Sequence, residues 1–243
     1  CVACVPERPV ACDEKPGKIS DMFKALFKND QAMTVVVSII LVYTSLNICG
    51  NLVLYFFRFD VGNEGAYSIF AAVAFAAQVL VMMVIPLLRK RFSKSQLFIS
   101  GFIIQIAGFA VILIMAFAKL YTPQSWYILC LPGILIYLGY GMLNVIMTIF
   151  LSDSVDYGEV MNGTREESVI FSMQTFTVKL ASGVAVFLAG LVVDWIHLDT
   201  AAAVQTQDTL DALRMWMTIP SVILLIVGIF VFKRFYKLND TRM

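Results

Sequence analysis

Long apolar runs separated by polar segments dominate this chain. Apolar residues fill nearly every position within each run instead of one helical face, so the runs do not resemble amphipathic helices of a soluble protein. Each run is about 20 residues long, the length at which an α-helix crosses the hydrocarbon core of a bilayer. The pattern predicts an all-α membrane protein with six transmembrane helices, at residues 33–57, 66–88, 97–118, 126–151, 169–193 and 216–232.

The polar segments between the runs define the remaining organisation. Residues 152–168 and 194–215 are the two long links, and the other connections are short. Residues 1–32 are predicted to be a cytoplasmic linker, in which residues 19–28 have apolar positions at helical spacing between lysines. Such a pattern is typical of an amphipathic helix on a membrane surface. Residues 233–243 are predicted to be a cytoplasmic tail.

Composition agrees with a membrane protein. Hydrophobic residues make up 60% of the 243 residues and charged residues 14%, against roughly 45–50% and about 25% in soluble domains. The net charge of +1 excludes nucleic acid as a partner, because a nucleic-acid-binding protein needs several basic residues to neutralise phosphates. The lipid bilayer is therefore the expected environment.

Motifs of enzymes, cofactors and metals are missing from the sequence. There is neither a glycine-rich phosphate loop nor a hydrolase motif, and Cys1, Cys4 and Cys12 have no nearby His or fourth Cys to complete a metal site. We expect neither an enzyme nor a bound metal or cofactor. The chain starts at Cys1 without a signal-peptide pattern, so we expect it to be a piece of a longer protein.

The distribution of basic residues predicts the orientation. Of the 18 Lys and Arg residues, only Arg58, Lys119 and Arg214 fall on one side of the predicted membrane, and Lys179 lies within a run. Cytoplasmic loops carry the excess of Lys and Arg. The richer side is therefore predicted to be cytoplasmic, which places both ends of the chain there.

Lys179 is the basic residue inside the fifth run. It lies roughly 16 Å along the helix, near the membrane centre. A charge at that depth costs at least about 2.5–3.5 kcal/mol and usually faces a cavity where it has a function. The side chain is too short to extend to the interface from there. Thr175 and Gln174 precede it by four and five residues, and we predict a functional polar site around Lys179.

Polar residues recur on two other runs. Asn47, Asn51 and Tyr55 repeat at helical spacing on the first run, and Tyr137, Tyr140 and Asn144 do so on the fourth. Two polar faces are what a shared aqueous pathway requires. Hydrogen bonding between helices explains each residue equally well.

Charged residues gather after the fourth run. If that helix continues, Asp153, Asp156 and Glu159 share one face at its C-terminal end. The helix dipole disfavours anions there, so cationic partners are expected: Arg165 is one, and a domain outside this chain would supply others. A solvated acidic loop is the alternative.

The charged segment and Lys179 together resemble a known signature. Asp153-x-x-Asp156-Tyr157-Gly158-Glu159, Arg165-x-Glu167-Ser168 and Phe171-Ser172-x-Gln174-Thr175-x-x-x-Lys179 are similar to the pattern of the glycoside–pentoside–hexuronide:cation symporters. The resemblance implies the major facilitator fold, with twelve helices in two halves and alternating access between them. This chain would be the C-terminal half of such a protein in a bacterial cytoplasmic membrane.

The same resemblance implies roles for individual residues. Lys179 would lie close to the cation and sugar sites, with Gln174 and Thr175 beside that path. Asp153, Asp156, Tyr157, Glu159, Arg165 and Glu167 would belong to a cytoplasmic gate. The N-terminal six-helix half would provide the main binding site for the coupling ion, Na⁺ or H⁺. It would also make most of the contacts with the sugar.

Two other functions stay open from the sequence. A lysolipid carrier of the same superfamily shares the architecture, and comparing sugar uptake with lysolipid uptake would separate the two. A membrane scaffold or sensor that transports nothing is the second alternative, although the polar faces and Lys179 argue against it. Asn144 stands where a family member carries an aromatic residue, which leaves the identity of the sugar open.

Overall fold

The computed structural model describes residues 29–162, 167–202 and 204–236. Within them, six helices are long and apolar enough to cross a membrane, which confirms the predicted all-α membrane fold. They are α2 (Asp30–Tyr55, extended by the π-helical turn η2, Phe56–Asp60), α3 (Ala66–Leu88), α4 (Lys94–Phe117), α5 (Cys130–Asn162, preceded by the 3₁₀ turn η3, Trp126–Leu129), α6 (Glu167–Trp195) and α7 (Gln207–Phe235). The predicted surface helix at residues 19–28 lies outside the described residues.

Side-chain caps fix where several helices begin. The Asn29 side chain accepts a hydrogen bond from the Ala32 amide at the start of α2. Ser93 and Gln96 form a capping box at the start of α4, in which each side chain bonds the other residue's backbone amide. These bonds satisfy amides that have no partner within the helix, so they fix the starts of α2 and α4 at the ends of the preceding polar segments.

The fourth helix is longer than predicted. A polar link was expected from residue 152, but α5 continues to Asn162. Ser154 and Val155 are buried there, and the Asn29 side chain donates a 2.8 Å hydrogen bond to the Ser154 carbonyl. A Cβ on Gly158 would lie 2.9 Å from the same Asn29 nitrogen. Packing against the start of α2 therefore keeps this polar stretch helical.

The sixth helix also begins earlier than predicted. The sequence pattern placed its start at residue 216, whereas α7 begins at Gln207 after the N-cap Thr206. Leu210, Leu213 and Arg214 are buried at helical spacing in this additional segment. The charged residues of this segment lower its mean hydropathy below the value typical of a transmembrane helix. The sequence pattern therefore excluded the segment, although one of its faces packs inside the bundle.

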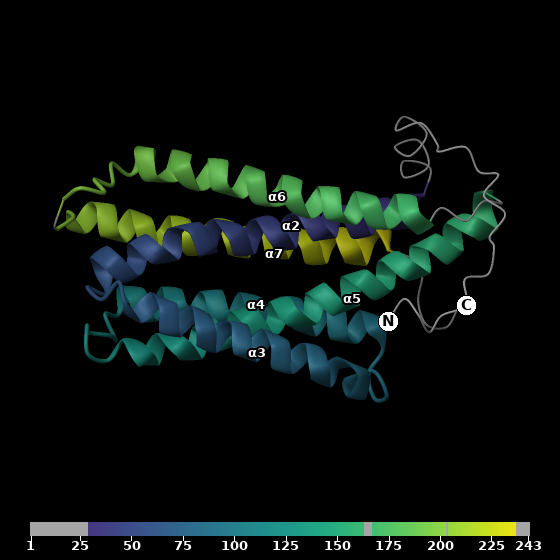
Figure 1. Ribbon diagram of the computed structural model, residues 1–243, viewed down its shortest axis with the longest axis horizontal. Helices are drawn as coiled ribbons and strands as arrows, with labels where there is room; N and C mark the ends of the chain where they lie inside the picture. The colour runs from purple at the N-terminus through teal and green to yellow at the C-terminus, as the bar shows by residue number, and fades with distance from the viewer. Residues whose placement is uncertain (1–28, 163–166, 203, 237–243) are drawn as a thin grey trace, which may run out of the picture.

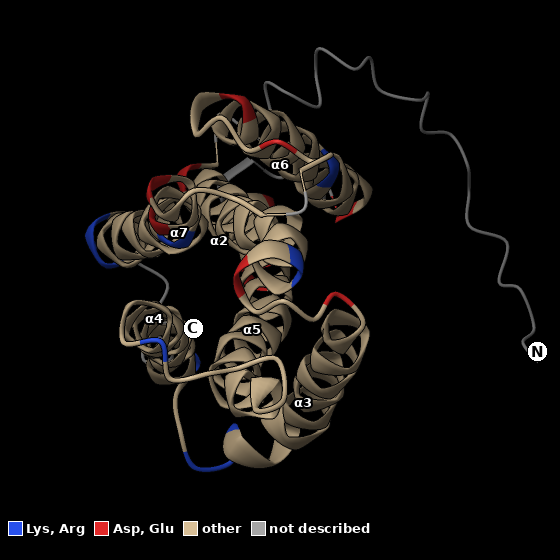
Figure 2. Cartoon of the chain, turned by 90° about the vertical axis from the view of Figure 1, so that its left-hand side faces the viewer, with Lys and Arg blue, Asp and Glu red and all other residues tan. Residues whose placement is uncertain are grey.

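The helices form a bundle around α2 and α5 (Figures 1 and 2). Helix α7 packs on α2 and helix α4 on α5, and α4 and α7 also contact each other. On the flanks, α6 packs on α2 and α3 packs on α5. The side of α2 and α5 turned away from α4 and α7 lies between the two flanking helices (Figure 2). We call it the open face.

The two three-helix units, α2–α4 and α5–α7, repeat the same packing scheme. The first helix of each unit contacts the second and third helices of the other unit. Helices α2 and α5 run in opposite directions, as the chain order across successive spans requires. This is the arrangement of inverted-topology repeats that many transporter folds share.

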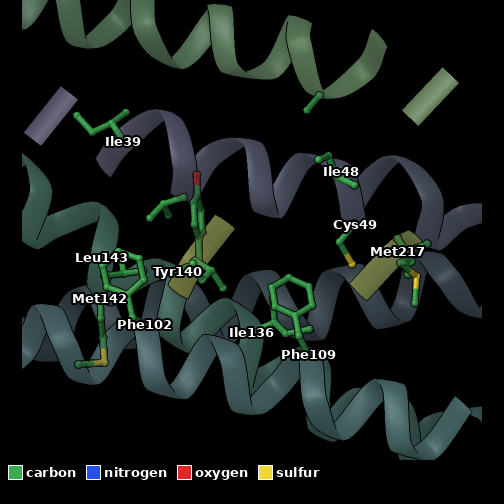
Figure 3. Packing of buried hydrophobic residues seen from close by; sticks show 14 of the residues in the cluster. Ile39, Ile48, Cys49, Phe102, Phe109, Ile136, Tyr140, Met142, Leu143 and Met217 are labelled. Carbon is green, nitrogen blue, oxygen red and sulfur yellow. The ribbon is translucent and has the colours of Figure 1, made fainter. Parts of the chain in front are cut away.

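The core fills the space between α2, α4, α5 and α7 with apolar side chains (Figure 3). Phe102, Phe109, Ile136 and Leu143 are buried at the contact of α4 and α5. Small residues allow the closest approach of these helices, since a Cβ on Gly139 would lie 2.6 Å from the Gly101 carbonyl oxygen. Close packing of this kind drives helix association in lipid.

The two ends of the bundle carry different polar clusters. We call the end with Asn29, Lys94 and Asp153 the inner end, and the end with Asp60 and Tyr121 the outer end. The predicted orientation places the inner end in the cytoplasm.

Candidate functional site

A belt of polar side chains crosses the open face at mid-depth. The Asn144 amide nitrogen on α5 donates a 2.5 Å hydrogen bond to the Tyr43 hydroxyl on α2. The rings of Tyr43 and Tyr140 meet edge to face with centroids 5.5 Å apart. Tyr43 lies about 20 Å from the start of its helix, a similar depth to that of Lys179 on α6.

The belt continues from α5 to α6. The Thr148 hydroxyl donates to the Asn144 carbonyl at 3.1 Å, and the Gln174 amide donates a long 3.4 Å hydrogen bond to the Thr148 hydroxyl. Amide and hydroxyl groups of α2, α5 and α6 are thus linked in one series, which we call the central belt: Tyr43, Asn144, Thr148 and Gln174. Hydroxyl and amide groups both donate and accept hydrogen bonds, so the belt can bind a neutral polar molecule.

Tyr43 and Thr148 were not predicted from the sequence. A signal for Tyr43 exists in the sequence, because Tyr43-Thr-Ser-Leu-Asn47 and Tyr140-Gly-Met-Leu-Asn144 share the pattern Tyr-x-x-Leu-Asn. The two copies lie on α2 and α5, the first helices of the repeated units. The same pattern thus supplies the central belt from both units.

The other polar residues predicted on these helices occupy different places. Asn47 and Asn51 each donate a 2.7 Å hydrogen bond to the backbone carbonyl four residues earlier. Tyr137 lines a small cavity of about 20 Å³ together with Tyr67, and its ring lies edge to face with Tyr140 at 6.4 Å. Tyr55 lines a separate cleft nearer the outer end.

Lys179 and Thr175 are exposed on α6. The exposed part of this helix is divided into two adjacent stripes. One stripe is bulky and apolar, as expected of a surface in contact with lipid: Phe176, Leu180, Val184, Phe187 and Leu191. The other stripe consists mainly of the residues that directly precede those of the first stripe in the sequence. Apart from Val186, its side chains are small or polar: Ser172, Thr175, Lys179, Gly183, Val186 and Gly190. Lys179 therefore lies on a different side of α6 from the lipid stripe.

The charged residues at the inner end are held on helices. Lys94 Nζ lies 2.7 Å from Asp153 Oδ2, with both side chains largely buried, at 15% and 13% exposure. A partner for Asp153 was expected in Arg165 or outside this chain, but Lys94 of α4 provides it. Asp156 and Glu159 are exposed on α5, Tyr157 is half-buried, and Glu167 begins α6. Arg165 lies outside the described residues.

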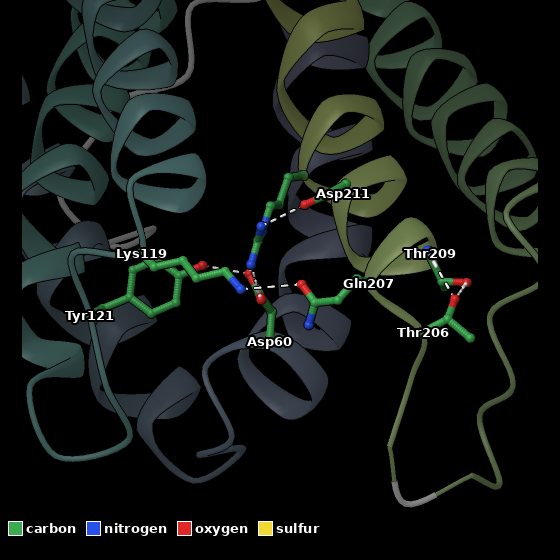
Figure 4. A network of polar contacts seen from close by, with 8 residues as sticks. Asp60, Lys119, Tyr121, Thr206, Gln207, Thr209 and Asp211 are labelled. Atoms are coloured by element: carbon green, nitrogen blue, oxygen red, sulfur yellow. Dashed lines mark hydrogen bonds and ion pairs between the residues drawn. The ribbon is translucent and has the colours of Figure 1, made fainter.

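A buried ion-pair network closes the outer end (Figure 4). Arg214 of α7 contacts both carboxylate oxygens of Asp60 in η2, at 2.5 and 2.9 Å, and its third nitrogen lies 2.7 Å from Asp211. The Tyr121 hydroxyl donates a 2.5 Å hydrogen bond to Asp60. Asp60 and Arg214 are each 3% exposed, and we call this set, with Tyr121 and Asp211, the outer network. From the sequence, Arg214 was expected in a loop, and its place in a buried ion-pair network was not predicted.

Tyr121 is a permanent donor in this network. Burial raises the pKa of Tyr121 far above its ordinary value, and the adjacent Asp60 carboxylate raises it further. The phenol therefore stays protonated throughout the physiological pH range, so Tyr121 remains a hydrogen-bond donor there. Among the described residues, no group of three or more His, Cys, Asp or Glu side chains could hold a metal ion.

A family model described as MFS/sugar transport protein matches residues 5–240. Similar curated proteins include the uncharacterized symporter YjmB of Bacillus subtilis, 26% identical over 91% of this chain and 47% of that protein. The raffinose carrier protein of Pediococcus pentosaceus is 24% identical over 87% of this chain and 33% of its own length. The isoprimeverose transporter of Lactiplantibacillus pentosus is 26% identical over 74% and 36%.

This chain thus spans about half the length, or less, of the curated relatives that it matches. The names of these relatives describe transport proteins, which agrees with the expectation that the chain is not an enzyme.

Proposed function

This chain belongs to the family of MFS/sugar transport proteins, and on that premise we propose that it forms half of a secondary transporter. The complete protein carries a sugar or glycoside together with Na⁺ or H⁺ by alternating access. An N-terminal six-helix half of the same protein supplies the other wall of the pathway. That half also provides the main binding site for the coupling ion. The protein lies in the bacterial cytoplasmic membrane, with both ends of this chain in the cytoplasm.

The central belt is the observation that carries this proposal. Hydroxyl and amide groups from α2, α5 and α6 meet at mid-depth on the face that α4 and α7 do not cover. Sugar hydroxyls also donate and accept hydrogen bonds, so such groups can replace the water around a sugar. Substrate sites of secondary transporters lie near the bilayer midplane between structural repeats, and the belt joins α2 and α5, the first helices of the two repeated units, to α6.

Lys179 supplies positive charge on α6, the helix that also carries Gln174 of the belt. It belongs to the small and polar stripe of α6, and Gln174, five residues before it, belongs to the belt itself. An ammonium group in this position repels a cation bound nearby or occupies its place when the site is empty. Lys179 therefore competes with, or electrostatically tunes, the coupling ion.

The inner end acts as a gate in this proposal. Asp156 and Glu159 are exposed on α5, where charged groups of the other half reach them when the cytoplasmic side is closed. Asp153 has a different role, because it already forms an ion pair with Lys94 within this chain. The pair holds α4 and α5 together while the gate opens and closes.

Replacing Lys179 tests the proposal directly. We expect Lys179→Val in the full-length transporter to abolish the dependence of sugar uptake on the cation gradient, because the tuning charge is gone. Uptake of labelled sugars into vesicles, with and without an imposed Na⁺ or H⁺ gradient, measures this. Leu180→Val on the adjacent lipid stripe is the matched control and should behave as wild type. Unchanged coupling in the Lys179 variant would refute the role of this lysine.

A further inference from the structure

A polar cleft lies between α2 and α6, nearer the outer end than the central belt. Its volume is about 320 Å³, and its walls include Asn51 and Tyr55 from α2 and Gly190 and Asp194 from α6. Small-molecule sites usually have volumes of roughly 300–1,000 Å³. The cleft is therefore large enough for one small ligand.

The cleft follows the central belt along the same face. Asn51 and Tyr55 lie about 12 and 18 Å further along α2 than Tyr43, at 1.5 Å per residue. Gly190 lies about 16 Å beyond Lys179 on the same stripe of α6. A molecule that moves along this face from the outer end thus meets the cleft before it meets the belt.

The polar groups of the cleft have hydrogen-bonding capacity to spare. Asn51 uses its amide nitrogen in a bond to the Asn47 carbonyl, which leaves its side-chain oxygen as an acceptor. Among the described residues, no side-chain hydrogen bond or ion pair occupies the Tyr55 hydroxyl or the Asp194 carboxylate. Two acceptors and one group that both donates and accepts therefore surround the space.

The α6 wall of the cleft is small because of Gly190. A Cβ added there would have no atom within 4 Å, so neither close helix packing nor a special backbone conformation within this chain requires glycine. A larger side chain would instead project into the cleft. The neighbouring Leu191 belongs to the lipid stripe of the same helix. Around the circumference of α6, the side chains therefore change from bulky on the lipid side to small at Gly190, beside the cleft.

We propose that this cleft is an outer binding subsite for the sugar, occupied before the sugar reaches the central belt. Asp194 and Asn51 accept hydrogen bonds from sugar hydroxyls, and Tyr55 provides a hydroxyl and an aromatic surface. The inference rests on the proposed sugar transport.

The test compares the two faces of the membrane in the full-length transporter. Uptake of a labelled substrate sugar is measured in right-side-out and in inside-out vesicles. We expect Asp194→Asn to raise the KM from the outer side about ten-fold, the loss expected for a hydrogen bond to a charged group. The KM from the inner side should stay unchanged. Gly190→Trp, which fills the cleft, should act in the same direction, whereas Leu191→Trp on the lipid stripe should match wild type.

Other results would overturn the inference. Equal changes on both sides, or a lower maximal rate at unchanged KM, would show that this face packs against the other half of the protein. Wild-type KM on the outer side in both Asp194→Asn and Gly190→Trp would show that no sugar binds in the cleft. In both cases wild-type sugar uptake persists, and the proposed function stands. Absence of sugar uptake by the wild type would refute the proposed function and the subsite together.

Discussion

Asp60 and Arg214 form the most deeply buried ion pair at the outer end. Moving both charges away from water has a large cost, which only good geometry and additional hydrogen bonds can offset. Arg214 satisfies both conditions, since it contacts both oxygens of Asp60 and also binds Asp211. Tyr121 binds the same carboxylate. The outer network thus connects η2 and α7 to the segment between α4 and α5.

Removing one charge of this pair should destabilise the protein strongly. We expect Asp60→Leu to lower the free energy of unfolding by about 3–5 kcal/mol, because Arg214 would remain buried without its counter-charge. The double variant Asp60→Leu/Arg214→Met should recover most of the loss. Thermal unfolding of the purified full-length protein in detergent measures this. Glu64→Leu, in an exposed pair with Arg58, is the control with little expected effect. A double variant as unstable as the single one would contradict the prediction.

Single residues could be predicted from the sequence when their surroundings made them unusual. Lys179 stood out because apolar residues surround it in the chain. Asp60 and Arg214 did not, since each lies at the edge of an apolar run and their pairing joins positions 154 residues apart. Tyr43 resembles an ordinary tyrosine of an apolar run until the fold places it beside Asn144.

At the scale of elements, the contact of α4 with α5 depends on glycine. Gly139 faces Gly101 and Gln105, and the backbones approach so closely that any larger residue at position 139 would overlap with α4. Helices in lipid associate through such packing, because lipid and apolar side chains are equally apolar.

Gly139→Val should therefore separate α4 from α5. We expect a loss of about 1–3 kcal/mol of stability, the usual cost of overpacking, and a lower unfolding temperature in detergent. Gly183→Val is the matched control, because a Cβ at Gly183 has no neighbour within 4 Å. Equal stability of the two variants would show that α4 can shift without cost.

The number of spanning helices could be predicted from the sequence. The C-terminal end of α5 and the N-terminal end of α7 could not. Hydropathy identifies the segment that lipid must solvate, and it stops where polar residues begin. Helix α5 continues past that point because Asn29 and the buried Ser154 hold it, and α7 starts before it because Arg214 is buried against Asp60. Both ends depend on contacts between distant segments, which hydropathy does not report.

At the scale of the molecule, one ion pair joins the two three-helix units at the inner end. Lys94 opens α4, the last helix of the first unit, and Asp153 lies on α5, the first helix of the second. The pair is less buried than the Asp60–Arg214 pair, so its contribution lies between those of exposed and fully buried pairs.

Reversing this pair tests its role. We expect Lys94→Glu to cost about 1–2 kcal/mol of stability, between exposed and buried pairs, and to slow transport because the two units separate. Lys94→Glu/Asp153→Lys should restore much of both, and Lys90→Glu in the same link is the control. Unfolding temperature and the initial rate of sugar uptake measure the two effects. A double variant no better than Lys94→Glu would show that the charges act on other partners.

The packing of α3 on α5 and of α6 on α2 has a consequence for biosynthesis. Helix α3 enters the membrane before its main partner has been synthesised, so it must persist in lipid by itself. Its sequence suits that delay, because no charged residue occurs between Ala66 and Leu88. Helix α6, which carries Lys179, enters when α2 is already in place. The order of synthesis thus brings the helix with a mid-membrane charge into the bilayer only after the helix that receives it.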